Sequence, residues 1–215
     1  MAGINAAYVF PGGNREVGFW GGVGITGFYR EFDYYVSFAK NGFRVALWDI
    51  YNFSSYDDPY WQPANRRIFY YRGDSTLHFL DLTVAYNFGD KFPLDVSVST
   101  ILYGRDRNVF QVRDGVQRRA DQDRYTTYIQ LTYPVHRGEK TTVKLYAAGA
   151  FALNGEGTPF VETPHFYGSK PNIVNAGVEV SQVVNIKGYE MPASATAMWN
   201  PEANLGMVQL ALTLF

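Results

Sequence analysis

The sequence predicts an all-β fold, an antiparallel transmembrane β-barrel of about 12 strands built as a single domain over residues 1–215. Three observations predict it. Segments of about ten residues alternate apolar and polar side chains, short turns alternate with long connections, and Tyr, Phe and Trp make up 17% of the chain. In such a barrel one face of each strand meets lipid and the other meets the lumen, and aromatic residues gather at both membrane interfaces.

The alternation is clearest over residues 80–88, where every second residue is Leu, Val, Tyr or Phe and the residues between them are Asp, Thr, Ala and Asn. Because successive side chains of a strand point to opposite faces, this segment has one apolar face. The same pattern recurs at 32–39, 94–99, 128–133 and 174–181. One such strand would suit a soluble β-sandwich, but its repetition along the chain favours contact with lipid.

The elements follow from this pattern in chain order. Strands are expected near residues 16–26, 31–39, 43–53, 77–88, 93–105, 123–134, 140–154, 172–186, 190–199 and 205–215. The connections at 40–42, 89–93, 136–140 and 186–189 are short, whereas those at 54–76, 106–122 and 155–170 are long. In bacterial barrels the short turns face the periplasm and the long loops face outside.

The strand count leaves two alternatives open. Residues 2–10 also alternate, which would make eleven strands, but bacterial single-chain barrels have even numbers of strands. Either ten strands carry an N-terminal arm, or a first strand lies upstream of this chain and the barrel has twelve. The chain ends in Phe215, and a terminal aromatic residue is typical of outer-membrane barrels, although Phe215 falls on the opposite face from Leu210, Leu212 and Leu214.

Composition restricts the possible partners. The net charge of −1 does not favour nucleic-acid binding, and the absence of cysteine excludes disulfides, thiolate catalysis and cysteine–zinc sites. No apolar run reaches the length of a transmembrane helix. No signal peptide is visible, so we expect a mature or recombinant form; the alternative is a protein that is not exported, which would exclude an outer-membrane barrel. The expected partner is the lipid bilayer of the outer membrane, and no cofactor is expected.

Strand parity predicts which polar and aromatic side chains point into the lumen. These candidates for a constriction are Asp33, Arg44, Asp81, Asp95, Lys144 and Glu179, with Trp20, Tyr35, Trp48, Tyr128 and Tyr146. They could line a polar constriction that selects small solutes. Alternatively, they could form a salt-bridged network that fills a narrow barrel, and we favour this alternative because about eight strands already enclose only a side-chain-filled interior.

The first long loop is rich in aromatic and basic residues. Its candidate binding residues are Tyr56, Tyr60, Trp61, Arg66, Arg67, Phe69, Tyr70 and Tyr71. Such residues are typical of binding hot spots, so the loop could bind a partner protein or a glycan. The alternative is that the loop folds over the barrel mouth and packs on its own rings.

Catalytic and metal sites are weakly indicated. Ser75 and His78, with the neighbouring Asp74, lie near the outer end of a strand and raise the hypothesis of a rim hydrolase, but spacing alone does not build a triad. His136 and His165 lack further ligands for a metal. The glycines of 22–27 match a dinucleotide pattern, but a strand follows them where a helix is needed. We therefore expect no catalytic residues and no metal.

Several blocks resemble a known family. These are EFDYYVSF (31–38), GFRVALWDIY (42–51), HFLDLTVAYNFG (78–89), TYIQLTYP (127–134) and WNP (199–201). Together they resemble small porins of Bacteroidota outer membranes, the TorF-like group. The resemblance implies a barrel of about 12 strands that crosses the outer membrane of a Gram-negative cell many times, with an extra N-terminal strand that we expect this chain to lack. It supplies no substrate and no catalytic residues.

The leading functional hypothesis is a small porin, a passive transport channel for small polar solutes with a narrow charged lumen and aromatic extracellular loops. Under this hypothesis we expect the protein not to be an enzyme. The first alternative is a non-conducting structural or accessory barrel whose loops bind a partner protein or glycan. The second alternative is the hydrolase at the outer rim.

Overall fold

The computed structural model describes residues 1–54, 67–73, 75–111, 117–154 and 165–213. These residues form strands and turns, with no helix among them. The strands are β1 (Ala2–Val9), β2 (Arg15–Val23), β3 (Arg30–Lys40), β4 (Phe43–Asn52), β5 (His78–Asn87), β6 (Asp95–Gly104), β7 (Arg107–Gln111), β8 (Gln117–Asp123), β9 (Thr126–Arg137), β10 (Thr141–Ala152), β11 (Asn172–Ile186), β12 (Tyr189–Asn200) and β13 (Leu205–Leu212). The described part of the chain contains no helix long and apolar enough to cross a membrane.

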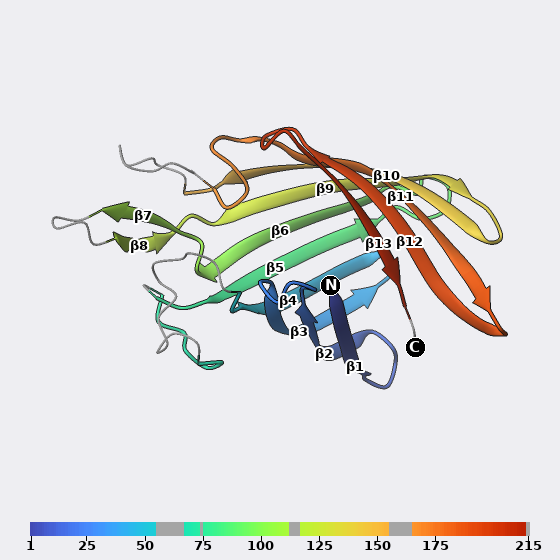
Figure 1. Ribbon diagram of the computed structural model, residues 1–215, viewed down its shortest axis with the longest axis horizontal. Helices are drawn as coiled ribbons and strands as arrows, with labels where there is room; N and C mark the ends of the chain where they lie inside the picture. The colour runs from blue at the N-terminus through green and yellow to red at the C-terminus, as the bar shows by residue number, and fades with distance from the viewer. Residues whose placement is uncertain (55–66, 74, 112–116, 155–164, 214–215) are drawn as a thin grey trace.

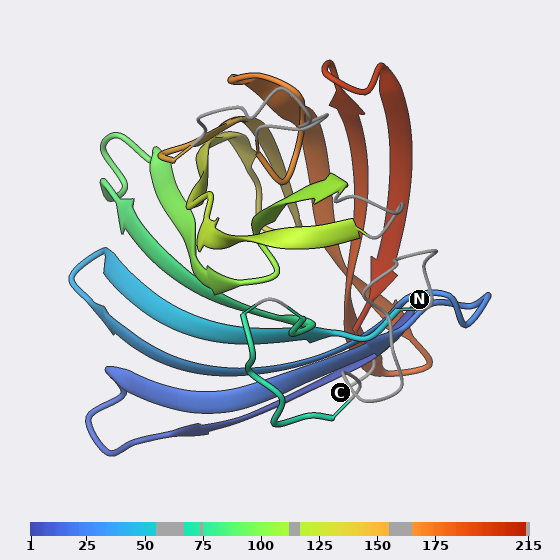
Figure 2. The ribbon, with the colours of Figure 1, turned by 90° about the vertical axis from the view of Figure 1, so that its left-hand side faces the viewer.

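Eleven of the strands form one antiparallel sheet in the order β1-β2-β3-β4-β5-β6-β9-β10-β11-β12-β13. Consecutive strands are neighbours throughout, except that β6 pairs with β9 because β7 and β8 form a separate two-stranded sheet. Figure 1 shows the long strands running side by side, and Figure 2 shows the sheet curling around a central space. Within the described residues no ladder joins β1 to β13, so these two are the edge strands.

The four short connections named above lie at one end of the sheet and the long ones at the other, as the sequence predicts, whereas the short connection 201–204 between β12 and β13 lies at the long-loop end. Two of the short turns have a clear chemical cause. Asn41 and Gly42 have φ angles of 52° and 82°, and Lys187 and Gly188 have φ angles of 53° and 91°. Positive φ at both central residues is the geometry of a type I′ turn, which suits the twist of a tight hairpin and favours Asn-Gly sequences. These turns fix the register of β3 on β4 and of β11 on β12.

The register divides the side chains between two faces, as the alternation predicts. The concave face carries buried small and aromatic side chains, among them Tyr35, Ala46, Ala85 and Ala148. The convex face carries large apolar side chains that remain exposed, among them Val84 at 38%, Val36 at 53% and Val208 at 76%. The sheet is therefore apolar on its outside, the reverse of an ordinary soluble protein.

The structure corrects the prediction for residues 106–122, which we expected to be a long irregular loop. They contain the hairpin β7–β8, which extends beyond the sheet at its long-loop end (Figure 1). Leu214 and Phe215, the aromatic terminus singled out above, lie outside the described residues.

Candidate functional site

The N-terminal half of the concave face is filled by aromatic rings. Tyr35 of β3 stacks on Trp48 of β4 with ring centroids 4.3 Å apart, and the two residues are directly opposed in register. Trp20 lies on the same face, opposite Asp33. Gly18 makes room for this packing, because a Cβ atom there would lie only 2.7 Å from the Tyr35 ring. Three of the predicted inward-facing rings thus occupy space that a solute would need.

The predicted inward-facing charges do not form one continuous network among the described residues. Asp33 is buried, and its Oδ1 atom has no hydrogen-bond partner in the described part of the chain. Asp81 accepts a hydrogen bond from Thr83 Oγ1 at 3.0 Å. Arg44 and Asp95 both line a cavity of about 490 Å³ at the short-turn end. Among the described residues, only Lys144 and Glu179 of this set form an ion pair with each other.

The C-terminal half of the concave face is hollow where the N-terminal half is filled. A cavity of about 580 Å³ is lined by side chains of β9 to β13, including Lys144, Tyr146 and Glu179. Lys144 Nζ lies 3.1 Å from Glu179 Oε1, and the two side chains remain 41% and 33% exposed. The pair is thus formed in the wall of a space that water can enter.

Three cavities follow one another along the concave face. Asp95 lines both the 490 Å³ and the 580 Å³ cavity, and Asn175 and Met198 line both the 580 Å³ cavity and a third of about 280 Å³. The third cavity is lined by Tyr128 and Tyr167 and lies toward the long-loop end. Together they form a path from the short turns toward the loops, polar over its first two cavities and lined mainly by aromatic and apolar side chains in the third, which we call the inner path.

The segment 165–170 narrows the inner path at the loop end. The ring of Tyr167 lies 5.2 Å from that of Tyr128, and the ring of Phe166 meets that of Phe79 edge-on at 5.1 Å. His165 is buried, and its Nε2 atom lies 2.8 Å from the carbonyl oxygen of Lys170. The segment is therefore folded on itself and against the wall of the sheet.

Glu202, in the connection between β12 and β13, holds this segment in place. Its Oε1 atom accepts hydrogen bonds from Ser169 N at 3.1 Å and Ser169 Oγ at 2.7 Å, and its Oε2 atom accepts one from Asn172 Nδ2 at 2.6 Å. These donors, Ser169 Oγ first, lower the pKa of the Glu202 carboxyl to about 2, because they stabilise the charged form.

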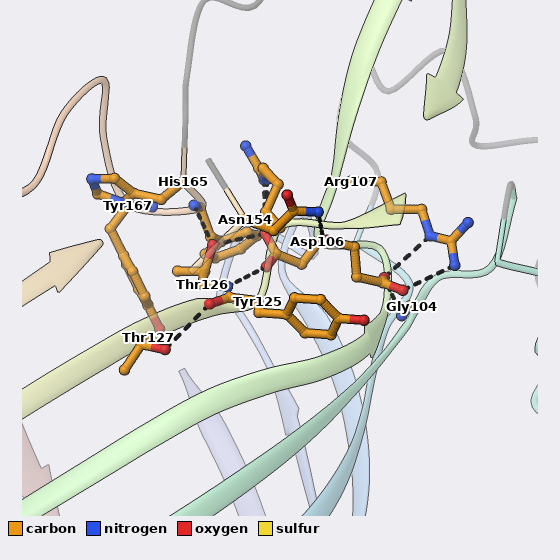
Figure 3. Close-up of polar contacts among 12 residues, drawn as sticks. Gly104, Asp106, Arg107, Tyr125, Thr126, Thr127, Asn154, His165 and Tyr167 are labelled. Carbon is orange, nitrogen blue, oxygen red and sulfur yellow. Dashed lines mark hydrogen bonds and ion pairs between the residues drawn. The ribbon is translucent and has the colours of Figure 1, made fainter. Parts of the chain in front are cut away.

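Asp106 anchors the base of the hairpin β7–β8 on the sheet (Figure 3). This fully buried carboxylate accepts hydrogen bonds from Arg124 Nε at 3.0 Å, from the Thr126 amide at 2.7 Å and from Thr126 Oγ1 at 2.9 Å. Burial lowers the pKa of Arg124, and the neighbouring Asp106 opposes that effect. Thr126 Oγ1 in turn accepts a hydrogen bond from Phe166 N at 3.0 Å, which connects this anchor to the segment 165–170.

A second carboxylate fixes the hairpin itself. Asp123 receives two parallel hydrogen bonds from Arg107, at 3.1 Å from Nε and 3.0 Å from a terminal guanidinium nitrogen, and a third from Gly104 N at 3.0 Å. Bidentate pairs of this kind are stronger and more directional than single contacts. This pairing explains why a polar segment that looks like a loop forms strands.

The predicted loop-binding residues are only partly described. Tyr56, Tyr60, Trp61 and Arg66 lie outside the described residues. Of the others, Phe69 is 76% exposed, and Tyr70 N donates to the carbonyl of Arg67 at 3.0 Å in a turn. The hydroxyl of Tyr71 donates to Asp49, and burial followed by this bond raises the pKa of the phenol.

His78 occupies the convex side of the sheet near the loop end. Its Nδ1 atom lies 2.7 Å from Asp49 Oδ1, and its ring stacks on Tyr51 at 4.5 Å and lies 4.3 Å from the ring of Tyr71. Ser75 Oγ forms a hydrogen bond with the hydroxyl of Tyr70 at 3.0 Å, and Asp74 lies outside the described residues. The carboxylate beside His78 is therefore Asp49, which the rim-hydrolase hypothesis did not include.

The described part of the chain contains no group of three or more His, Asp or Glu residues that could hold a metal ion. His136 lies near the short turn between β9 and β10, and His165 is engaged by the backbone of its own segment.

Three residues that organise the site were not predicted. Asp106, Tyr167 and Glu202 all lie in connections, where strand parity gives no direction for a side chain. The pattern Trp199-Asn-Pro-Glu202 at the end of a strand was the only available signal for Glu202, because Asn and Pro mark a turn in which a carboxylate can reach neighbouring donors.

Comparison of the chain with protein-family models, with curated proteins and with solved structures returns no match.

Proposed function

We propose that this chain forms a transmembrane β-barrel of a Gram-negative outer membrane and acts as a narrow passive channel for small polar solutes. The observation that carries the proposal is the apolar convex face. Tyr8, Val17, Val36, Leu47 and Leu82 lie side by side in register across β1 to β5. A second row crosses the other half of the sheet as Leu145, Val178, Ala197 and Val208.

An apolar surface of this extent is rare on monomeric soluble proteins and marks contact with lipid or another protein. It continues over every strand of the sheet, whereas a protein partner would cover only part of a curved wall. Lipid can cover all of it. The exposed aromatic side chains of Phe88, Tyr133 and Trp199 near strand ends fit the aromatic belts found at membrane interfaces.

Closure of the barrel in lipid calls for one more strand. In an antiparallel sheet of eleven strands, β1 and β13 point in the same direction. One strand antiparallel to both would give every backbone group a partner, which matters because each unsatisfied group in lipid costs several kcal/mol. This number agrees with the barrel of about 12 strands implied by the resemblance to the small Bacteroidota porins.

The inner path supports transport of solutes. It is polar over the two cavities nearest the short turns and runs along the concave face toward the loop end, where Tyr167 of the segment 165–170 narrows it. A path this narrow fits slow passage of small molecules, since wide aqueous channels need about 16 strands or more.

Single-channel recording in planar bilayers tests the proposal. The wild-type protein should give small discrete conductance steps, and Tyr167→Ala should increase the step by about twofold or more because it removes a ring that narrows the loop end of the path. Tyr189→Ala, which removes a tyrosine exposed at the β11–β12 turn, should leave the step unchanged. A purified protein that stays monomeric and soluble without detergent, or that gives no steps with either tyrosine variant, would overturn the proposal.

A second function is favoured by the exposed apolar side chains at the loop end. Ile25 and Phe69 are both largely exposed there, although neither lies on the convex lipid-facing rows. They suit an accessory barrel whose loops bind a partner protein or a glycan. Loss of a surface-bound partner from the Phe69→Ala variant, with conductance retained, would add this role to the channel.

A further inference from the structure

The 580 Å³ cavity has an ordered arrangement of side chains that goes beyond a generally polar lumen. Residues on neighbouring strands form lateral rows across its wall. One row reads Pro134, Lys144, Glu179, Thr196 and Gln209 across β9 to β13. This row contains a cation, a carboxylate and two uncharged polar side chains side by side, so we call it the charged row.

The next row on the same face is mostly apolar. It reads Thr132, Tyr146, Gly177, Met198 and Met207, and Asp95 of β6 lies opposite Thr132. Of the five, Thr132, Tyr146 and Met198 line the cavity. Gly177 is needed there, because a Cβ atom at this position would lie 2.5 Å from the hydroxyl of Tyr146 and would displace the ring. Methionine side chains are flexible and polarisable and adapt to varied apolar shapes. We call this row the apolar row.

The spacing of the two rows matches a small amphipathic molecule. Residues two apart on a strand lie about 6.8 Å apart, a length comparable to that of a free amino acid. The cavity volume of about 580 Å³ lies within the range of small-molecule sites. A ligand with charges at one end and a hydrocarbon group at the other could therefore contact both rows at once.

The charged side chains of the cavity determine which charged groups a ligand should carry. The cavity is lined by Asp95, Glu179, Arg137 and Lys144, so its two acidic and two basic side chains balance. Arg137 also pairs with Asp90 at 3.3 Å, so the charges nearest the solute are those of Lys144 and Glu179, and a solute with a single charge could attract only one of these two side chains. A zwitterion can place its carboxylate on Lys144 and its ammonium on Glu179, and charge-assisted hydrogen bonds of this type are the strong ones.

The Lys144–Glu179 pair is accessible to such a ligand. Both side chains are partly exposed toward the cavity, and on the β9 side Lys144 faces Pro134, whose side chain cannot hydrogen-bond. On the β12 side Glu179 faces Thr196, a small residue that leaves space for a solute.

We propose that the charged and apolar rows form a binding site for free amino acids with aliphatic side chains. The inference rests on the proposed channel function, which it deepens by naming the solute class. Bound solute would lie along the inner path with its charged end on Lys144 and Glu179 and its side chain against Tyr146 and Met198.

Isothermal titration of the detergent-solubilised protein tests the site without requiring passage across a membrane. L-leucine should bind, whereas 4-methylpentanoate, which lacks the ammonium, and isoamylamine, which lacks the carboxylate, should bind at least about tenfold more weakly, or about 1.4 kcal/mol. Glycine, which lacks the side chain, should also bind more weakly than leucine. Equal binding of leucine and its two singly charged analogues, or binding of none of them, would overturn the site.

Matched variants separate binding from folding. Lys144→Met and Glu179→Gln should each weaken leucine binding by about tenfold or more. Lys140→Met and Glu139→Gln, in the exposed turn of the same hairpin, should not change it. The double exchange Lys144→Glu with Glu179→Lys keeps the pair and reports on folding if a single variant is unstable. Binding of a neutral sugar in preference to leucine would also overturn the assignment.

Uptake by liposomes distinguishes this inference from the channel function. Leucine binding without leucine entry into protein-containing liposomes would leave the site intact and remove the channel. Entry of small polar solutes that is insensitive to Lys144→Met and Glu179→Gln would leave the channel intact and remove the amino-acid site.

Discussion

At the scale of single residues, the ionised carboxylate of Glu202 holds the segment 165–170, which narrows the loop end of the inner path. Its folded-state pKa of about 2 lies below the ordinary value of 4.5, so the charged form stabilises the folded contacts. That stabilisation is fully present above about pH 4.5 and is lost as the pH falls through about 2. The contacts at risk are those to Ser169 and Asn172, which hold the segment 165–170.

We therefore expect the Ser169 amide to exchange its hydrogen faster as the pH falls from about 4.5 to about 2, after correction for intrinsic exchange. In Glu202→Gln the corrected rate should be fast at every pH, because a neutral amide is a weaker acceptor. Glu190→Gln, on β12 outside this contact, is the matched control and should behave as wild type. A corrected rate in wild type that does not change with pH would contradict this role of Glu202.

Asp106 provides a second prediction at this scale. Asp106→Ala leaves the guanidinium of Arg124 buried without its carboxylate, and breaking a buried pair in this way costs roughly 3–5 kcal/mol. The loss should appear as higher hydrogen exchange of the Arg124 amide and of β7–β8. Asp90→Ala removes an exposed partner of Arg137 and should cost about 1 kcal/mol or less. Similar costs for the two variants would show that Asp106 is not an anchor.

The sequence predicts well on which face of the sheet a strand residue's side chain lies. It predicts poorly which side chains of other strands that residue contacts. Lys144 and Glu179 could be assigned to one face by parity, but their contact depends on the register of β10 on β11, which includes a bulge at Ala148 and Gly149. Asp106 and Arg124 form an ion pair although the hairpin β7–β8 separates them in the sequence, and no local sequence pattern predicts this contact.

At the scale of elements, hydrophobic alternation in the sequence predicts the strands of the large sheet but not the hairpin β7–β8. A strand in the large sheet is recognisable because its convex face is continuously apolar, as in β5. The hairpin lies beyond the sheet and is held by Arg107 and Asp123, so its sequence is as polar as that of a loop. Long-range pairing of side chains, which is invisible to local patterns, decides its structure.

The apolar convex face predicts a depth-dependent cost for charge. Val84→Arg and Val178→Arg, near the middle of β5 and β11, should each destabilise the membrane-inserted protein by roughly 2–4 kcal/mol. Val135→Arg, near the short-turn end of β9, should cost only about 0–1 kcal/mol, because arginine there can reach the interface. Urea titrations of the protein refolded into vesicles measure these differences. Equal small costs at all three positions would indicate a convex face exposed to water.

At the scale of the whole molecule, β1 and β13 are the edges that the proposed membrane-spanning form would have to close, because no ladder among the described residues covers them. Both strands are exposed along their whole length, and Figures 1 and 2 show the curled sheet returning the C-terminal strand toward the side of the N-terminus. No ladder among the described residues joins these two strands to each other. Because β1 and β13 run in the same direction, one strand antiparallel to both could pair with each of them.

Hydrogen exchange across the sheet tests this interpretation. In this 215-residue chain in micelles, the amides of β1 and β13 that point away from β2 and β12 should exchange far faster than those at the centre of β9 and β10, because no ladder covers them. Supplying a closing strand, from additional chain or from a second copy, should protect both edges together, since one strand pairs with both. Protection of β1 and β13 equal to that of β9 and β10 in the monomeric 215-residue chain would mean that the edges already pair with each other. In that case the barrel would close with eleven strands and one parallel ladder.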